Sequence, residues 1–311
     1  MDSLKKKSLL VVGGTGFIGT VLLKKANQLG METTSLSLHK PTSINLINNT
    51  NYVITDTSNL ENLEKIFLNK KFNYIVNLAG YINHDLISSG GFSIIESQLN
   101  LLNNLVSIFN SKELIRFIQI GSSDEYGLNK SPQTEAVREN PISPYSFAKL
   151  MNTHYLQMLN LTEHFPAVMI RLFLVYGPHQ KFNRLIPFVI KSCLNNNKFN
   201  LSEGSQIRDF CYVEDVVDAI INSLLSNNIN GHILNIGSGE NISVKEIVKK
   251  ICMLTKLGEP KFNKQFSRLI ENKNLFPDIS KAKKLLSWKP KTSLDVGLTK
   301  TILWYKEKLN Y

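Results

Sequence analysis

Short apolar segments alternate with amphipathic segments through the first two-thirds of the chain. The apolar segments read as buried strands, and they cover residues 9–13, 33–38, 52–55, 74–78, 117–121 and 167–173. Apolar positions at helical spacing mark three of the intervening segments, residues 60–68, 96–110 and 145–161. This alternation predicts an α/β fold of the Rossmann type, a doubly wound parallel sheet that binds ligands at the carboxyl ends of its strands.

The last third of the chain loses this alternation. Its helical patterns, at residues 185–193, 213–225, 244–254 and 294–309, are joined by segments rich in Gly, Asn and Pro. We expect residues 1–175, with about 206–237 returning to them, to form a dinucleotide-binding Rossmann domain. Residues 176–205 and 238–311 are expected to form a smaller, mainly helical C-terminal domain that binds the substrate.

The first predicted strand stops at a run of glycines, and a helical pattern follows at once. Glycines at such a place allow a tight turn, close approach of the backbone to a phosphate, and close packing of helix on strand. The positive end of the helix then faces the phosphate. We expect dinucleotide binding here, with an ordinary glycine turn as the alternative. The residues concerned are Gly13, Thr15, Gly16, Phe17, Ile18 and Gly19.

The end of the second predicted strand bears on which dinucleotide is bound. An NAD site usually has Asp or Glu about 20 residues after the glycines, where it holds the ribose hydroxyls. Here Ser37, His39 and Lys40 stand at that point without a carboxylate, which favours the 2′-phosphate of NADP. The alternatives are a solvated loop at these positions and NAD as the cofactor.

Two further strand ends complete the expected cofactor site. Asp56 and Thr57 follow the third predicted strand, where Asp56 can meet the edge of the adenine. Leu78, Ala79 and Gly80 follow the fourth and would pass behind the cofactor.

Tyr145 and Lys149 are spaced for proton transfer on one helix. Ser143 can cap that helix, and four residues make about one turn, so phenol and ammonium share a face roughly 6 Å apart along the axis. A nearby Lys⁺ stabilises tyrosinate and is expected to lower the pKa of the phenol. Tyr126 and Lys130 have the same spacing, but neighbouring Gly, Asn and Pro residues make a helix unlikely to form there.

Hydroxyl and acidic side chains stand at the end of the fifth predicted strand. Ser122, Ser123 and Asp124 reach the carboxyl edge of the sheet, where a hydroxyl can hydrogen-bond a substrate carbonyl or alkoxide. A turn rich in Ser and Asp is the alternative. With Tyr145 and Lys149 on the next helix, catalysis is the favoured interpretation.

Taken together, these motifs resemble those of the extended short-chain dehydrogenase/reductases, in the branch of nucleotide-sugar epimerases, dehydratases and 4-ketoreductases. The resemblance covers essentially the whole chain. It implies that Ser122, Tyr145 and Lys149 form a catalytic triad beside a nicotinamide. The motifs are the glycine run, Gly121-Ser122-Ser123-x-x-Tyr126-Gly127, Tyr145-x-x-x-Lys149, Arg171-Leu172-Phe173-Leu174-Val175-Tyr176-Gly177-Pro178, Arg208-Asp209-Phe210, Asp278-Ile279-Ser280-Lys281-Ala282-Lys283 and Trp288-Lys289-Pro290.

The resemblance also implies a nucleotide-diphosphate sugar as substrate. Arg208 would contact the diphosphate, as a guanidinium can, with a surface ion pair to Asp209 as the alternative. The loop at residues 80–84 would reach over the sugar, and family members often form homodimers through the helices at 96–110 and 145–161. The residues implied in substrate binding are Tyr81, His84, Ser122, Ser123, Asn183, Arg208 and Arg268.

Two departures from the family pattern bear on the reaction. Dehydratases typically carry Asp-Glu or Ser-Glu after the catalytic hydroxyl, where this chain has Ser123-Asp124, and Glu125 stands where an apolar residue is common. Leu174 stands where many epimerases and dehydratases have Asn. We therefore expect NADPH-dependent reduction of a nucleotide-linked 4-keto-deoxysugar, in cell-surface glycan (lipopolysaccharide) precursor synthesis. An NAD-dependent 4-epimerase or 4,6-dehydratase, with Asp124 as an acid/base, and a non-catalytic cofactor-binding regulator are the alternatives.

Composition and charge further limit the partners and the location expected for the protein. The net charge of +11 comes from scattered lysines without an aromatic-interleaved basic stripe, so we expect no nucleic-acid partner. No apolar run approaches the roughly 20 residues that span a bilayer, and we expect neither a signal peptide nor a membrane partner. The three widely spaced cysteines indicate neither disulfides nor a metal site, so a cytoplasmic location is the default.

Overall fold

The structure is a computed structural model that describes residues 2–80, 85–263 and 272–309. Within these residues the largest sheet has seven strands in the order β11-β6-β5-β4-β1-β2-β3. All neighbouring strands in it are parallel. Its strands are β1 (Ser8–Val12), β2 (Glu32–Ser37), β3 (Thr50–Ile54), β4 (Tyr74–Asn77), β5 (Arg116–Ser122), β6 (Ala167–Leu172) and β11 (Ile233–Ile236). The six strands expected from the apolar pattern are confirmed, and β11 is an addition.

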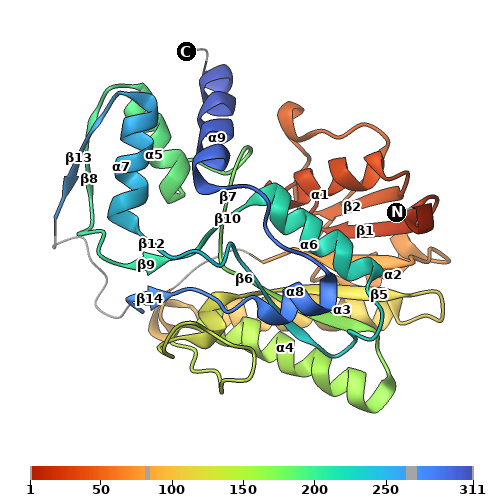
Figure 1. Cartoon of the computed structure of the whole chain (residues 1–311). Coiled ribbons are helices and arrows are strands. Elements are labelled where there is room, and N and C mark those ends of the chain that lie inside the picture. The colour runs from red at the N-terminus through yellow and green to blue at the C-terminus, as the bar shows by residue number, and fades with distance from the viewer. Residues whose placement is uncertain (1, 81–84, 264–271, 310–311) are drawn as a thin grey trace.

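Alternate side chains of β1 pack into opposite helical layers, which accounts for a strand that is apolar throughout. Leu9 and Val11 belong to a core with α1 (Phe17–Gln28), α6 (Val213–Leu225) and α8 (Ser280–Leu286). Leu10 and Val12 belong to a core with α2 (Leu60–Phe67), α3 (Phe92–Phe109) and α4 (Pro144–Glu163). In Figure 1 α1 and α6 lie above the sheet and α4 below it. The Rossmann-type doubly wound fold is confirmed.

The strand order reverses beside β1, and this reversal locates the ligand crevice. From β1 the chain builds β2 and β3 on one side, then crosses to β4, β5 and β6 on the other. At such a switch point the loops leave the carboxyl ends of adjacent strands in opposite directions and open a crevice. The glycine turn after β1, the loop after β4 and the end of β5 therefore meet there.

A smaller, mainly helical lobe follows the sheet. Its apolar core includes Val189 of α5 (Leu185–Leu194), Ile251 of α7 (Val244–Thr255) and Leu298 of α9 (Leu294–Leu309). Figure 1 shows α5, α7 and α9 together on one side of the molecule. Its short strands are β7 (Leu174–Tyr176), β8 (Lys198–Leu201), β9 (Ile207–Arg208), β10 (Phe210–Tyr212), β12 (Ile242–Ser243), β13 (Glu259–Phe262) and β14 (Asn274–Leu275). The remaining short helices are η1 (Asp2–Leu4), η2 (Ser43–Asn45), η3 (Ile87–Ser89) and η4 (Ser123–Tyr126).

Two properties of the described residues bear on the broad class of the protein. None of the helices in residues 2–80, 85–263 and 272–309 is long and apolar enough to cross a membrane. The same residues contain no group of three or more His, Cys, Asp or Glu side chains that could hold a metal ion. The three cysteines are free thiols.

Candidate active site

The glycine turn between β1 and α1 is shaped for a phosphate. Gly13 has a φ of +82°, which side chains disfavour. A Cβ on Gly19 would lie 2.4 Å from the Gly13 carbonyl oxygen, so α1 can pack this closely on the turn because Gly19 has no side chain. Gly16 caps α1 without a side-chain hydrogen bond, and the first turn of α1 carries no acid. The first N–H groups of α1 are thus directed at an incoming anion, which fits a dinucleotide pyrophosphate.

The neighbouring strand ends close around this turn. A Cβ on Gly13 would come within 3.2 Å of the Ala79 nitrogen, so the segment after β4 lies directly against the glycines. On the other side, the Thr15 N–H donates to the Ser37 hydroxyl at 3.2 Å. The structure therefore brings Leu78–Gly80 and Ser37 to the phosphate turn.

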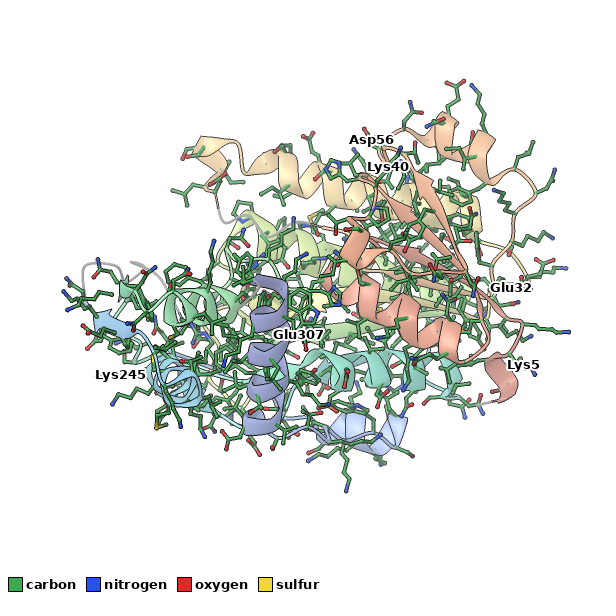
Figure 2. The ribbon with its side chains drawn as sticks, turned by 90° about the horizontal axis from the view of Figure 1, so that it is seen from above. Lys5, Glu32, Lys40, Asp56, Lys245 and Glu307 are labelled. Carbon is green, nitrogen blue, oxygen red and sulfur yellow. The ribbon has the colours of Figure 1, made fainter. Side chains whose placement is uncertain are left out.

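Beyond Ser37 the chain leaves the sheet with exposed side chains. His39 and Lys40 are both exposed. Asp56 leaves the adjacent strand β3 at the same edge, accepts a hydrogen bond from the Ser58 N–H at 2.9 Å, and is exposed as well. Figure 2 shows Lys40 and Asp56 at this end of the molecule. Lys40 and Asp56 are therefore exposed beyond the ends of the neighbouring strands β2 and β3.

The three catalytic candidates converge at the ends of β5 and α4. Tyr145, in the first turn of α4, is buried, and its phenol is hydrogen-bonded by the Ser122 hydroxyl. The ammonium nitrogen of Lys149 lies 6.0 Å from the centre of the Tyr145 ring. Lys149 also donates to the carbonyl oxygens of Ile120 at 3.1 Å and Ala79 at 3.4 Å. The lysine therefore joins α4 to the ends of β4 and β5.

The electrostatics of this pair differ from the expectation. Burial raises the pKa of Tyr145, and the nearby charge of Asp124 raises it further, while the Ser122 hydrogen bond opposes both. The lowered phenol pKa expected from Lys149 is therefore wrong for the structure as it stands. Burial lowers the pKa of Lys149 to about 8, against the opposing charge of Glu125. The phenol of Tyr145 is accordingly kept in its protonated form, from which it can donate a proton.

Asp124 and Ser123 follow the catalytic hydroxyl in η4. The Asp124 N–H donates to the Ser122 oxygen at 3.1 Å, and the Asp124 carboxylate acts on Tyr145 through its charge. Asp124 is half-buried and Ser123 is buried. Asp124 thus stands near enough to the phenol for its charge to raise the pKa of Tyr145.

The expected substrate residues are only partly described. Asn183 is exposed just before α5. Arg208 is buried and donates to the Ile207 and Lys273 carbonyl oxygens. Asp209 is also buried, which excludes an ion pair at the surface. Tyr81, His84 and Arg268 lie outside the described residues.

Three residues near the triad were not assigned from the sequence. Arg184, the N-cap of α5, lowers the pKa of Tyr145 by its charge. Gln98 of α3 is buried, and neither polar atom of its amide has a hydrogen-bond partner among the described residues. It lies beside Gly80, whose added Cβ would be 3.6 Å from the Gln98 nitrogen and 3.2 Å from the Lys149 nitrogen. Glu125 is buried beneath Ser122. The departure of Glu125 from the family pattern was the available signal; Arg184 and Gln98 gave none.

Known proteins are similar to this chain over most of its length. The sequence profile of the "NAD dependent epimerase/dehydratase family" matches residues 9–237. The chain belongs to this family. It is therefore an enzyme of the extended short-chain dehydrogenase/reductase type, as its motifs implied.

Relatives of known name divide between two reactions. The dTDP-glucose 4,6-dehydratase of Haemophilus influenzae is 26% identical and aligns over 96% of this chain and 97% of its own. The UDP-glucuronate 4-epimerase of Thermodesulfobacterium geofontis is 27% identical over 96% of each chain. Among solved structures, the UDP-glucose 4-epimerase of Thermotoga maritima, with UDP-glucose, has a TM-score of 0.88 at 25% identity over 97% of this chain and 99% of that one. The UDP-glucuronic acid 4-epimerase of Bacillus cereus, a complex with NAD, has a TM-score of 0.85 at 26% identity over 97% and 99%.

Proposed function

We propose that this enzyme transfers hydride at C4 of a nucleotide-diphosphate sugar. The observation that carries the proposal is the convergence of Ser122, Tyr145 and Lys149 beside the phosphate-binding glycine turn. Homologues that bind or act on nucleotide sugars at C4 support the substrate class. The sugar would lie across the ends of β5 and α4, with its diphosphate toward Arg208 and Asn183.

Each residue of the triad has a distinct task in this reaction. A bound nicotinamide cofactor supplies or accepts the hydride. Ser122 holds the oxygen on C4 by a hydrogen bond, and Tyr145 gives that oxygen its proton or takes it. The Lys149 charge stabilises the phenolate that Tyr145 becomes when it gives up the proton. The glycine turn between β1 and α1 would hold the pyrophosphate of the bound cofactor.

In its finer form the proposal is NADPH-dependent reduction of a 4-keto-deoxysugar nucleotide. Ser37, His39 and Lys40 support NADP, because they place a hydroxyl and a cation near the ribose and no carboxylate. Reduction requires Tyr145 to give its proton to the forming alkoxide, and the raised pKa keeps the phenol protonated until that step. Leu174 offers the sugar an apolar surface, with 40% of its side chain exposed at the start of β7.

A 4,6-dehydratase or 4-epimerase that uses NAD is the second candidate. Asp124 favours the dehydratase, because elimination of water needs a further acid/base beside the phenol. The named relatives favour both activities, and solved neighbours contain NAD. A regulator that binds cofactor without turnover is disfavoured by the intact triad.

The test offers the purified enzyme 4-keto-6-deoxysugar nucleotides, dTDP-glucose and UDP-glucose in separate assays. We expect NADPH consumption with dTDP-4-keto-6-deoxyglucose or its UDP counterpart. Tyr145→Phe should lose about 100- to 10,000-fold in rate, the usual contribution of a general acid. Tyr155→Phe is the matched control, since Tyr155 lies on the same helix but only hydrogen-bonds Asn103. Wild-type turnover in Tyr145→Phe would refute the proposal.

The reaction products distinguish the 4-ketoreductase from the dehydratase or epimerase. Formation of a 4-keto-6-deoxysugar from dTDP-glucose, without net NADPH consumption, would identify a dehydratase. Conversion of UDP-glucose to UDP-galactose by protein containing tightly bound NAD would identify an epimerase. Either result would replace the reductase assignment and leave C4 hydride transfer in place.

The outer face of α4 supports a homodimer. Exposed side chains recur there at helical spacing, and several are large and apolar. A monomer would leave this stripe in water, whereas pairing α3 and α4 with their copies would bury it. The exposed residues are Phe147, His154, Met158 and Leu161, and Met151 between them is half-buried.

A further inference from the structure

Glu125 carries a buried charge directly beneath the catalytic hydroxyl. Its side chain is fully buried, as is that of Arg171, with which it forms an ion pair at 2.8 Å. An isolated charge is costly to bury, so a buried charge is usually surrounded by several hydrogen-bond and ion-pair partners. Full burial keeps Glu125 from serving as the acid of a dehydratase, whereas Asp124 next to it is half-buried.

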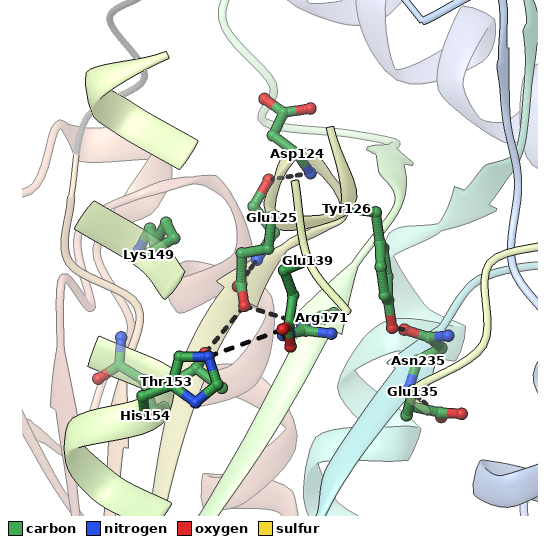
Figure 3. A network of polar contacts seen from close by, with 12 residues as sticks. Asp124, Glu125, Tyr126, Glu135, Glu139, Lys149, Thr153, His154, Arg171 and Asn235 are labelled. Atoms are coloured by element: carbon green, nitrogen blue, oxygen red, sulfur yellow. Dashed lines mark hydrogen bonds and ion pairs between the residues drawn. The ribbon is translucent and has the colours of Figure 1, made fainter. Parts of the chain in front are cut away.

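The carboxylate of Glu125 joins three elements. One oxygen accepts the Ser122 N–H at 2.8 Å, at the end of β5. The other accepts the Thr153 hydroxyl of α4 at 2.9 Å and the Arg171 Nε of β6 at 2.8 Å. Thr153 follows Lys149 by one helical turn, so it lies on the same side of α4. Glu125 therefore links the strand that carries Ser122 to the helix that carries Tyr145 and Lys149, as Figure 3 shows for Thr153 and Arg171.

The surroundings of Glu125 are built to hold it still. Gly121 makes room, because a Cβ there would lie 2.4 Å from the carboxylate. Arg171 is itself fixed, since it donates to Glu139 at 2.6 Å and its guanidinium lies 4.5 Å from the centre of the Tyr126 ring. A group locked by such partners can set the geometry of its neighbours to a fraction of an ångström.

We propose that Glu125 is a positioning residue for catalysis, which fixes α4 against the end of β5 so that Ser122 and Tyr145 converge on one substrate oxygen. The proposal rests on the proposed function, because it assumes that Ser122, Tyr145 and Lys149 act together. A buried ion pair that only stabilises the fold is the competing explanation.

Glu125 also acts on Lys149 through its charge. Lys149 is surrounded by groups from several elements. Glu125 approaches it from η4, and Tyr145 lies on its own helix, α4. The carbonyl oxygens of Ile120 and Ala79 accept hydrogen bonds from it at the ends of β5 and β4. Among these groups Glu125 is the one that raises the pKa of Lys149 against burial. Removing its charge should let that pKa fall, so that Lys149 loses its proton at a lower pH.

The experiment measures kcat, KM and the pH profile of the enzyme with the nucleotide sugar that proves to be its substrate in the assays above. We expect Glu125→Gln to lower kcat about 10- to 100-fold, because misplacing a reacting group by about 1 Å can cost that much. KM should stay within about threefold, since substrate contacts are unchanged. The alkaline limb of kcat should move to lower pH by on the order of one unit.

Two further variants separate positioning from stability. Thr153→Val cuts the link to α4 and keeps the charge, so kcat should fall about tenfold with an unmoved alkaline limb. It also provides the test if Glu125→Gln does not fold. Asp215→Asn is the control for a buried carboxylate, because Asp215 accepts the Lys291 and Thr292 N–H groups remote from the triad. It should lower the melting temperature and leave kcat and its pH profile unchanged.

These experiments distinguish failure of the Glu125 proposal from failure of the proposed function. Full activity in Tyr145→Phe would refute the proposed function itself. An inactive Tyr145→Phe together with wild-type kcat in Glu125→Gln or Thr153→Val would overturn only the role of Glu125. A loss of kcat in Asp215→Asn equal to that in Glu125→Gln would assign Glu125 to stability alone.

Discussion

Replacement of Gly19 by alanine places a methyl group where the backbone already lies. The new Cβ would be 2.4 Å from the Gly13 oxygen and 2.7 Å from the Gly14 Cα, both atoms of the turn itself. Neither atom can rotate away, so α1 must shift outward from the turn. Overpacking of this kind costs about 1–3 kcal/mol. At about 2–4 °C per kcal/mol, Gly19→Ala should lower the melting temperature by about 2–12 °C.

Gly16→Ala provides the contrast within the same turn. The nearest atom to its new Cβ is the Gly13 oxygen, at 3.2 Å, and the φ of −80° suits alanine. The cost to folding should stay under about 1 kcal/mol, as for a weak N-cap. The methyl group would instead stand where a phosphate approaches α1, so we expect the Kd for NADPH to rise at least about tenfold, equivalent to about 1.4 kcal/mol.

Thermal melts of both variants, with and without NADPH and NAD, check this reasoning. A ligand at a hundred times its Kd stabilises the folded state by about 2.7 kcal/mol, so wild-type protein should show a clear upward shift. Gly16→Ala should melt near the wild-type temperature and lose most of the ligand-induced shift. A Gly19→Ala protein with the melting temperature and affinity of wild type would refute the packing argument. Loss of stability in Gly16→Ala with unchanged affinity would refute the phosphate assignment.

Three other predictions follow from the site and the surface. Lys40→Glu should raise the Kd for NADPH about tenfold and change that for NADH less than about threefold, measured by fluorescence titration; equal effects would remove the support for NADP. Turnover should fall as pH rises through about 8, where Lys149 loses its charge, and a flat profile from pH 7 to 10 would show that the charge is not needed. Met158→Glu should give monomers in light scattering, whereas Met253→Glu on α7, at a site that is more exposed, should not; a wild-type mass for Met158→Glu would refute the dimer face.

The local sequence pattern was sufficient to predict the parallel sheet and the phosphate-binding turn. β1 and β4 to β6 are largely apolar runs, β2 and β3 carry β-branched residues between turn residues, and α1 begins where the glycines end, so neighbours in sequence decide these elements. β11 was missed because residues 233–236 are too short to declare a strand by themselves, and pairing with β6 makes them one. α8 was also missed, since its apolar face becomes visible only against α6.

The sequence by itself determined which groups can do the chemistry: the glycines of the turn, the hydroxyl of Ser122, and Tyr145 four residues before Lys149 on one helix. These follow from strand ends and helical periodicity, which are local. Only the tertiary structure decided how the groups are held and charged. Burial, which depends on the whole fold, raises the pKa of Tyr145 and lowers that of Lys149. The contacts of Glu125 with Thr153 and Arg171 join residues 28 and 46 positions apart in the sequence, and no local pattern reports a partner at that distance.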